Sequence, residues 1–216
     1  MGKMAYGIHT ATNVSNVLNC LKNNGKTFVG RYFAVTNTWK SLTKIEAQNI
    51  SSAGLYIVSI WEDGPADKPS YFTYDQGKKD GNNAFHYAAD IQQTANTPVF
   101  FAVDFDATSS HKQAILDYFV GVRDGYLQYL YERRKYGEEE IYYKIGVYGS
   151  YDVLTWCKEQ DIATYFFQAY APAWSNGRNK DPWPGYHLRQ LGSNQDLCNI
   201  KVDPDESSGA AGGWKY

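Results

Sequence analysis

Short apolar runs alternate with longer amphipathic segments along most of this chain. The runs predict strands, and they lie at residues 5–8, 27–34, 55–61, 98–105, 144–148, 165–170, 186–191 and 197–202. The amphipathic segments have the period of a helix, and they lie at residues 13–22, 41–54, 75–94, 110–135 and 151–158. In the second of these, Thr43 and Glu46 form a capping-box pattern and Gly54 is placed to end the helix. Gly77 and Gly81 weaken the helix expected at 75–94.

Strands with uncharged apolar sequences, such as Val99 to Val103, are typical of a parallel sheet covered on both faces. Eight of them in βα alternation close most naturally into a barrel. We therefore expect an α/β fold, a single (β/α)8 TIM-type barrel over residues 1–216 that is helix-poor in its last third. A doubly wound open sheet is the alternative, but no G-x-G-x-x-G motif follows the first strand. Residues 204–216 include the small-residue run Ser207–Gly213, and we expect them to form a loosely held tail.

The composition narrows the classes of partner. A net charge of -2, with Lys and Arg scattered, argues against binding to nucleic acid or to anionic lipid. Aromatic residues are abundant, with 19 Tyr and 6 Trp, and such side chains fill cores but also form grooves on which sugars stack. No apolar run approaches the length of a membrane span, and the N-terminus lacks the hydrophobic centre of a signal peptide.

The cysteines and histidines show no pattern of a metal site. Cys20, Cys157 and Cys198 are too few and too scattered for a disulfide framework and have no CxxC spacing. We expect buried, reduced thiols, with one bridge and one free thiol as the alternative. The histidines also lack metal-ligand spacing, so we expect no metal and no cofactor.

Polar residues stand where the predicted strands end, which is where barrels of this kind carry their working side chains. These residues are His9, Arg31, Glu62, Asp104, Asp106, Tyr148, Gln168, Gln190 and Asp203. Asp104 and Asp106 are two apart, so on one strand they would point to the same side. Two nearby carboxylates repel each other, which raises one pKa and allows an acid and a base in one site. A turn in which Asp acts as a cap, and a metal pair, are the alternatives.

Other residues are candidates for substrate binding. Trp61 and Glu62 together are suited to one sugar subsite, with a plain loop acid as the alternative for Glu62. A buried amide such as Gln168 or Gln190 needs either a protein partner or a ligand. Trp174 and Trp183 flank the loop at 175–182, as groove walls or as anchors of that loop. His9 fits a structural role as well as a catalytic one.

Several segments, taken in order and spacing, carry a resemblance to a known family. They are Gly7-Ile8-His9, Phe28 to Tyr32, Leu42 to Glu46 with Ala53-Gly54-Leu55, Phe101 to Asp106, Ile145 to Gly149, Phe167-Gln168-Ala169, Leu188-Arg189-Gln190 and Val202-Asp203. Over nearly the whole chain the sequence resembles the glycoside-hydrolase-like barrel family, a former domain of unknown function related to family 25 lysozymes. The resemblance implies a barrel that acts on, or binds, bacterial cell-wall glycan.

The resemblance also implies roles for individual acids. Asp104 and Asp106 fall where family 25 lysozymes carry an Asp-x-Glu pair, in which the second acid donates a proton and the first assists the N-acetyl group of the substrate. Asp203 falls near the acidic residue on the last strand of that family. Two positions differ, because Asp106 replaces a Glu and His9 replaces an Asp. The loss of an acid at position 9 affects catalysis more than recognition.

Two functions therefore stand beside each other. The first is a glycosidase acting on peptidoglycan-type, N-acetylated glycan, with Asp104 and Asp106 catalytic and with His9, Arg31, Trp61, Glu62, Tyr148, Gln168, Gln190 and Asp203 binding substrate. The second is a non-catalytic, wall-binding module on the same barrel. A barrel acting on another phosphate-free small substrate is a third reading, because a fold does not fix a function. We expect a monomer, extracellular or associated with the cell wall, with a cytoplasmic location or another export route as the alternatives.

Overall fold

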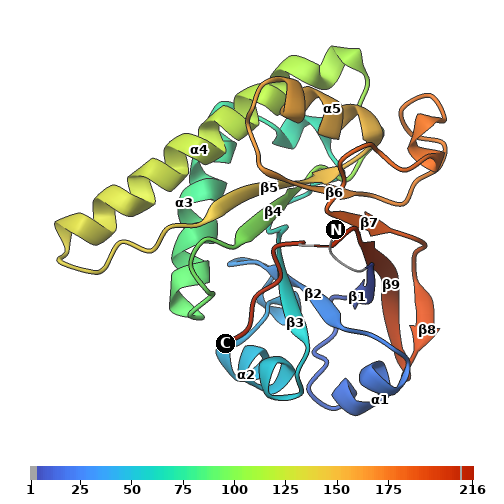
Figure 1. The fold of residues 1–216 in the computed structure, drawn as a ribbon. Coiled ribbons are helices and arrows are strands. Elements are labelled where there is room, and N and C mark those ends of the chain that lie inside the picture. The colour runs from blue at the N-terminus through green and yellow to red at the C-terminus, as the bar shows by residue number, and fades with distance from the viewer. Residues whose placement is uncertain (1–3, 210) are drawn as a thin grey trace.

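The computed structural model describes residues 4–209 and 211–216, and these form a closed barrel with helices packed outside it (Figure 1). The strands are β1 (Ala5–His9), β2 (Phe28–Phe33), β3 (Tyr56–Trp61), β4 (Pro98–Ala102), β5 (Lys144–Gly149), β6 (Tyr165–Gln168), β7 (Leu188–Gln190), β8 (Gln195–Leu197) and β9 (Ile200–Ser207). Strands β1 to β7 follow one another in parallel, and β9 closes the barrel between β7 and β1. The expected (β/α)8 barrel is confirmed.

The helices cover the outside of the barrel unevenly. They are α1 (Leu18–Asn23), α2 (Lys44–Ser52), α3 (Tyr74–Asp90), α4 (Lys112–Lys135) and α5 (Tyr151–Glu159). Short 3-10 turns occur at η1 (Thr38–Lys40), η2 (Pro69–Tyr71), η3 (Ser109–His111) and η4 (Arg178–Lys180). In the described part of the chain after α5, η4 is the only helical segment, as the helix-poor last third led us to expect.

The last barrel strand differs from the expectation of an all-parallel sheet. β9 is antiparallel to both β7 and β1. Only residues 191–199 separate β7 from β9, and a parallel crossover needs a dozen residues or more. The chain therefore turns back through β8, and Cys198 and Asn199 form the turn with φ angles of 56° and 64°. The strand expected at 197–202 is wrong, since this hairpin turn lies inside it.

Helices α3 and α4 pack against each other more closely than ordinary side chains permit. Gly77 and Gly81 of α3 face Gly121 and Gly125 of α4, and the four positions repeat every four residues. A Cβ added at any of them would stand 1.9–2.2 Å from a backbone carbonyl oxygen of the other helix. The glycines that lower the helix propensity of α3 are therefore what lets the two helices meet.

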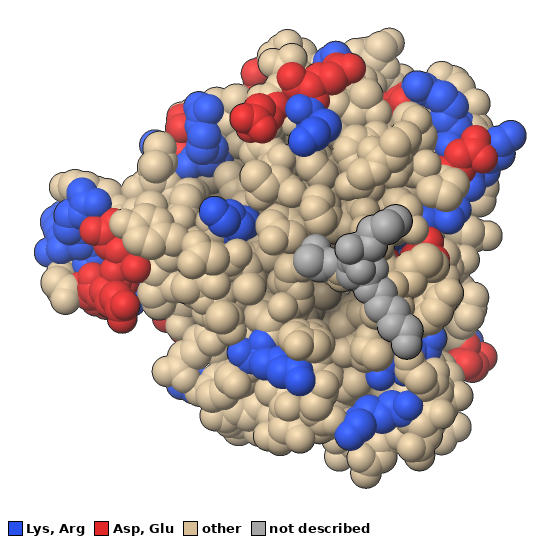
Figure 2. All heavy atoms as spheres, in the orientation of Figure 1, with Lys and Arg blue, Asp and Glu red and all other residues tan. Residues whose placement is uncertain are grey.

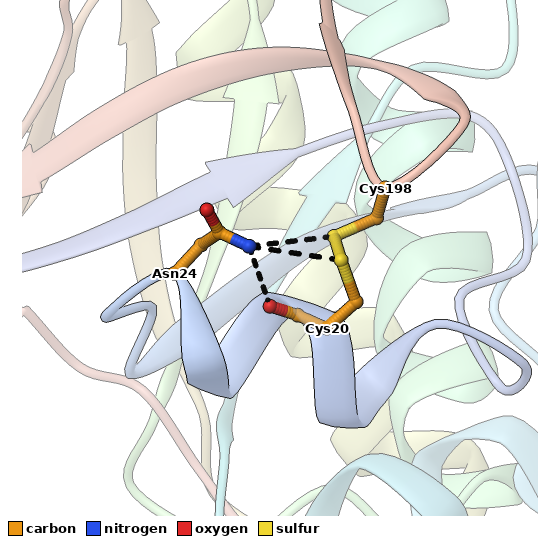
Figure 3. The surroundings of a disulfide bond; sticks show 3 residues. All are labelled: Cys20, Asn24 and Cys198. Atoms are coloured by element: carbon orange, nitrogen blue, oxygen red, sulfur yellow. Dashed lines mark hydrogen bonds between the residues drawn. A yellow bond between two sulfur atoms is a disulfide. The ribbon is translucent and has the colours of Figure 1, made fainter.

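A disulfide joins the start of the barrel to its end. Cys20 on α1 and Cys198 in the β8–β9 turn are bonded, with their Cα atoms 5.9 Å apart (Figure 3). Cys157 is free and buried. The expectation of three reduced thiols is therefore wrong. The pairing brings together positions 178 residues apart, and sequence spacing could not show that these two thiols meet.

The end of the chain is less loosely held than expected. Ser207 is buried at the end of β9, and Trp214 is only 2% exposed. The backbone of Trp214 pairs with that of Ile57 on β3, and its indole Nε1 donates to Ser59 Oγ at 2.9 Å. The buried indole of Trp214 and its hydrogen bonds to β3 thus hold the end of the chain against the barrel.

The surface carries charges of both signs. On the face shown in Figure 2, Lys and Arg lie among Asp and Glu in separate small groups. At the end of α4, Arg133 pairs with Glu138 at 2.9 Å and Arg134 with Glu140 at 2.8 Å. Within the described residues, no helix is both long and apolar enough to cross a membrane.

Candidate active site

Two adjoining cavities open where the parallel strands end. The inner one, of about 230 Å³, is lined by His9, Tyr32, Ile60, Glu62, Asp104, Tyr148, Tyr170, Ala171, Trp174, Gln190, Ser193 and Asp203. The outer one, of about 640 Å³, is lined by Thr36, Asn37, Lys40, Glu62, Asp63, Gly64, Pro65, Ala66, Asp67 and Asp104. Glu62 and Asp104 belong to both linings. The two cavities therefore meet at these two carboxylates.

His9 lies at the floor of the inner cavity between two carboxylates. Its Nε2 is 3.1 Å from Asp203 Oδ2, and its Nδ1 is 2.9 Å from Asp205 Oδ2. Burial by itself lowers the pKa of His9, but Asp205 and Asp203 outweigh it and raise this pKa to about 10. A neutral imidazole would also turn one lone pair toward a carboxylate. His9 is therefore a buried imidazolium at neutral pH.

The same contact fixes the charge of Asp203. Burial alone would raise the pKa of Asp203, but the hydrogen bond from His9 lowers it below its ordinary value. The backbone N–H of Asn194 donates to Oδ1 of Asp203 at 2.6 Å, and the carboxylate still lines the cavity. Asp203 reaches the mouth because β9 runs antiparallel, which places Asp203 beside His9 in the register of β9 with β1.

Asp104 has the opposite electrostatic surroundings. Burial, followed by the nearby charge of Glu62, raises the pKa of Asp104 from 3.8 to about 6, and His9 offsets this only in part. Its backbone N–H is bonded to the carbonyl of Ala66, so the residue is fixed against the loop that forms the outer cavity. A carboxyl that holds its proton near pH 6 can act as a general acid.

Glu62 is paired with a lysine that the sequence did not predict. Lys40 Nζ donates to Glu62 Oε1 at 2.7 Å and lies 4.9 Å from the centre of the Tyr32 ring. Lys40 comes from η1, before the N-cap of α2 at Thr43, so no strand-end argument could have found it.

The far wall of the inner cavity is aromatic and amide-rich. Tyr148 donates its hydroxyl to Gln190 Oε1 at 2.8 Å, and the backbone N–H of Tyr170 donates to the same oxygen at 2.9 Å. Burial, followed by the charge of Asp104, raises the pKa of Tyr148 well above its usual range. Tyr148 therefore stays protonated and Gln190 is held in one orientation.

Arg31 does not reach the cavity. It is 1% exposed, and its Nε and Nη2 donate to the two carboxylate oxygens of Glu46 at 2.8 and 3.1 Å. Glu46 also accepts from the backbone N–H of Val14 at 2.9 Å. Glu46 therefore fixes Arg31 and the segment that leads into α1. Thr43 caps α2 by accepting from the backbone N–H of Glu46.

Trp61 and Gln168 also point away from the cavity. Trp61 is 2% exposed and belongs to the core. Gln168 donates Nε2 to the carbonyl of Asp181 at 2.9 Å and accepts at Oε1 from the backbone N–H of Trp183 at 2.8 Å. Both its polar groups are used to hold the loop after β6. Trp183 is one of that loop's buried anchors, whereas Trp174 forms part of the cavity wall.

Asp106 is separated from Asp104 because β4 ends at Ala102. The two acids therefore do not share a strand, and the period-two argument fails. Asp106 is exposed and lines a third depression, of about 360 Å³, together with Asp152, Trp156 and Arg178. Its Oδ1 accepts from the backbone N–H of Ser175 at 3.0 Å.

Of the predicted site residues, the cavity brings together His9, Glu62, Asp104, Tyr148, Gln190 and Asp203.

Comparison with known proteins identifies the fold family. The model of the Rv2525c-like, glycoside hydrolase-like domain matches residues 19–207. The chain belongs to this family. It is 30% identical over 206 residues to the uncharacterized protein YbfG of Bacillus subtilis, a match that covers 89% of this chain and 27% of that protein. The uncharacterized protein FadG of the same organism is 30% identical over 162 residues, or 73% of this chain and 26% of that protein. The chain thus spans about a quarter of the length of these curated relatives.

Several solved structures share this fold. The Tat-secreted protein Rv2525c of Mycobacterium tuberculosis superposes with a TM-score of 0.76 at 18% identity, covering 97% of this chain and 98% of that one. The spore cortex lytic enzyme SleM of Clostridium perfringens gives a TM-score of 0.56 at 10% identity over 94% of this chain and 67% of that one. A muramidase from Acremonium alcalophilum gives 0.53 at 14% identity, covering 96% and 95%. At these identities the likeness shows the fold.

Proposed function

We propose that this glycoside hydrolase-like barrel cleaves an N-acetylated, peptidoglycan-type glycan, with Asp104 as the proton donor. One observation carries the proposal. Asp104 stands where the two cavities meet, and burial together with Glu62 raises its pKa to about 6. A glycan chain that occupied both cavities would place a glycosidic oxygen beside a carboxyl that is protonated in mildly acidic solution.

The proposed reaction divides the acid and the charge between different residues. The proton of Asp104 goes to the leaving oxygen as the glycosidic C–O bond breaks, and the acetamido oxygen of the substrate bonds to the anomeric carbon. This bond closes a five-membered ring between the acetamido group and the sugar. Water then attacks the anomeric carbon, opens that ring and gives its proton to the Asp104 carboxylate, which restores the acid. Asp203, kept ionised by His9, is suited to accept a hydrogen bond from the acetamido N–H.

The geometry favours Asp104 over Asp106 as the acid. Asp106 lines neither of the two joined cavities, whereas Asp104 lines both. The muramidase and the spore cortex lytic enzyme share the fold, and their names support a cell-wall glycan as the substrate class.

A second candidate function is a glycan-binding module without turnover. The observation that favours it is the imidazolium of His9, which neutralises carboxylate charge at the cavity floor where an acid would otherwise stand. Aromatic walls at Tyr170 and Trp174 would serve recognition equally well.

One experiment separates the two functions. Purified bacterial peptidoglycan is incubated at pH 5.5 with the wild-type protein, with Asp104→Asn and with Asp117→Asn, the last being a matched change on the outer helix α4. We expect all three proteins to sediment with the wall, and only Asp104→Asn to lose release of reducing ends, by at least about 100-fold. Binding by all three without any release would support the binding module and contradict the hydrolase.

The location proposed for the protein is extracellular. The Cys20–Cys198 disulfide supports this, because such bonds persist in oxidising compartments. The relative Rv2525c is described as Tat-secreted, which points the same way.

A further inference from the structure

Asp106 is left without a role by the proposed reaction, although it follows Asp104 by two residues. Its carboxylate is not idle, because Oδ1 accepts from the backbone N–H of Ser175 at 3.0 Å. This bond spans 69 positions in sequence and ties the segment after β4 to the loop after β6. The segment after β4 therefore carries one acid that lines the cavity, Asp104, and one acid that is bonded to a neighbouring loop, Asp106.

The loop residue that Asp106 holds is conformationally unusual. Ser175 has a φ of 57° and Asn176 a φ of 55°, a left-handed backbone conformation that residues other than glycine rarely adopt. Ser175 is 2% exposed, and its Oγ accepts from the backbone N–H of Asp152 at 3.0 Å at the start of α5. Such backbone persists only where neighbours hold it in place. Asp106 and Asp152 are two of those neighbours, and the third is Arg178, whose backbone N–H and Nε donate to the Ser175 carbonyl at 3.2 and 3.3 Å.

The residue before Ser175 is Trp174, which lines the inner cavity with Tyr170 and Ala171. The ends of this loop have their own anchors. The side-chain amide of Asn179 donates to the carbonyls of Ala169 and Ala171 at 2.9 and 3.0 Å, and Gln168 holds the far end. Asp106 is therefore the contact that fixes the middle of the loop relative to the segment bearing Asp104.

We propose that Asp106 is a positioning residue: its carboxylate holds Ser175 in the left-handed turn and thereby fixes Trp174 as a wall of the cavity that Asp104 lines. The inference rests on the proposed glycan site, and it assigns Asp106 a contribution to substrate binding instead of proton transfer. The ligand it serves is a sugar ring, which stacks on an aromatic side chain by its apolar face.

Two substitutions at one position distinguish this role from an acid. Asn keeps an oxygen that can accept from Ser175 N–H but cannot deliver the proton of a carboxylic acid, whereas Ala can do neither. For release of reducing ends from peptidoglycan, we expect Asp106→Asn to keep kcat and KM within about twofold of wild type. We expect Asp106→Ala to raise KM about five- to tenfold with a smaller change in kcat, as the loss of one hydrogen bond predicts. If turnover by Asp106→Asn instead fell about 100-fold or more, the inference would be overturned and Asp106 would be the acid.

A second readout keeps the test independent of turnover. Amide hydrogen exchange on the ligand-free protein is compared for wild type, Asp106→Asn and Asp106→Ala. Faster exchange at 174–177 in the alanine variant only is the expected result, even if the protein proves to be a binding module. Equal exchange in all three would overturn the positioning role, whereas absent turnover with this expected pattern would count against the proposed hydrolase alone.

Discussion

The carboxylates of the cavity fall into two electrostatic kinds. Asp203 is bonded to the imidazolium of His9, and its pKa lies below its ordinary value. Among the described residues, no Lys, Arg or His lies within 4.0 Å of the Asp104 carboxylate, and its pKa is raised to about 6. His9 thus keeps Asp203 charged, while burial and Glu62 keep Asp104 protonatable, a division that suits acid catalysis beside a fixed negative charge.

The raised pKa of Asp104 has a consequence for stability. Since the folded protein binds this proton more tightly than the unfolded chain, the contribution of Asp104 to stability falls as the pH rises from about 4 to about 6. Asp104→Asn removes the penalty of the buried charge, so we expect it to raise the free energy of unfolding at pH 7.5 by about 1–2 kcal/mol, allowing for partial solvent screening. At pH 4 the gain should vanish. Urea unfolding at both pH values measures this, and a destabilised variant at pH 7.5 would contradict it.

Residue-level prediction from the sequence succeeded for position along the strand and failed for direction at Arg31, Trp61 and Gln168. Tyr32, Ile60 and Tyr148 line the cavity, whereas their neighbours Arg31 and Trp61 face outward. Alternation along each strand decides between the two faces. His9 pairs with Gly30 in the β1–β2 register, and Tyr32 pairs with Ile60 in the β2–β3 register. Because alternate residues of a strand share a face, Tyr32 lies on the same face as Gly30, and this register would have chosen Tyr32 over Arg31.

Other site residues carry no such signal. Lys40 lies on a segment outside the strands, and Asp205 is buried beside His9 on a strand whose reversed direction was not predicted. Their places depend on the course of loops and on the reversal of β9. Those are tertiary facts that neither period nor spacing encodes.

At the level of elements, four glycines set the distance between α3 and α4. They lie in the phase of a four-residue repeat on both helices, and each meets a backbone carbonyl. From sequence alone Gly77 and Gly81 indicate a weak helix, because propensity describes an isolated segment. In the folded protein the close approach of the helices outweighs that cost.

A single methyl group at this interface should separate the helices. Gly77→Ala places a Cβ 1.9 Å from the backbone carbonyl oxygen of Tyr118 on α4. Because that oxygen is part of the backbone, the clash is relieved only if one of the two helices moves. We expect a loss of about 2–4 kcal/mol in the free energy of unfolding despite the better helix propensity of alanine. Lys79→Ala on the exposed face of α3 is the control and should be near neutral. Thermal unfolding of both variants checks this, and a stabilised Gly77→Ala would refute the packing argument.

At the level of the whole molecule, the barrel is closed by a reversed strand and a covalent bond. β9 brings Asp203 and Asp205 to His9, and Cys198, in the turn just before β9, is bonded to α1. The connection between β7 and β9 is too short for a parallel strand, so β9 runs antiparallel and places both acids beside His9 at the floor of the cavity. Alternating strands and helices were enough to predict the barrel, but the closing strand required knowledge of what lies beside β1.

The disulfide should make a measurable contribution to stability. Crosslinking residues 178 positions apart lowers the entropy of the unfolded chain, which corresponds to at most about 5 kcal/mol in the chain-entropy model. We expect the double variant Cys20→Ser, Cys198→Ser to unfold at a lower temperature by several degrees or more. Dithiothreitol should lower the wild-type transition and leave that of the double variant unchanged. An equal response in both proteins would show that the bond is absent or without effect.

The pH dependence of turnover tests the central claim most directly. If Asp104 is the proton donor, kcat/KM for reducing-end release should fall above a pH of about 6, the value set by burial and by Glu62. Glu62→Gln removes the nearby negative charge, so the break should move to lower pH by about half a unit or more. A profile that stays flat to pH 8, or a break that does not move in Glu62→Gln, would contradict the assignment of Asp104.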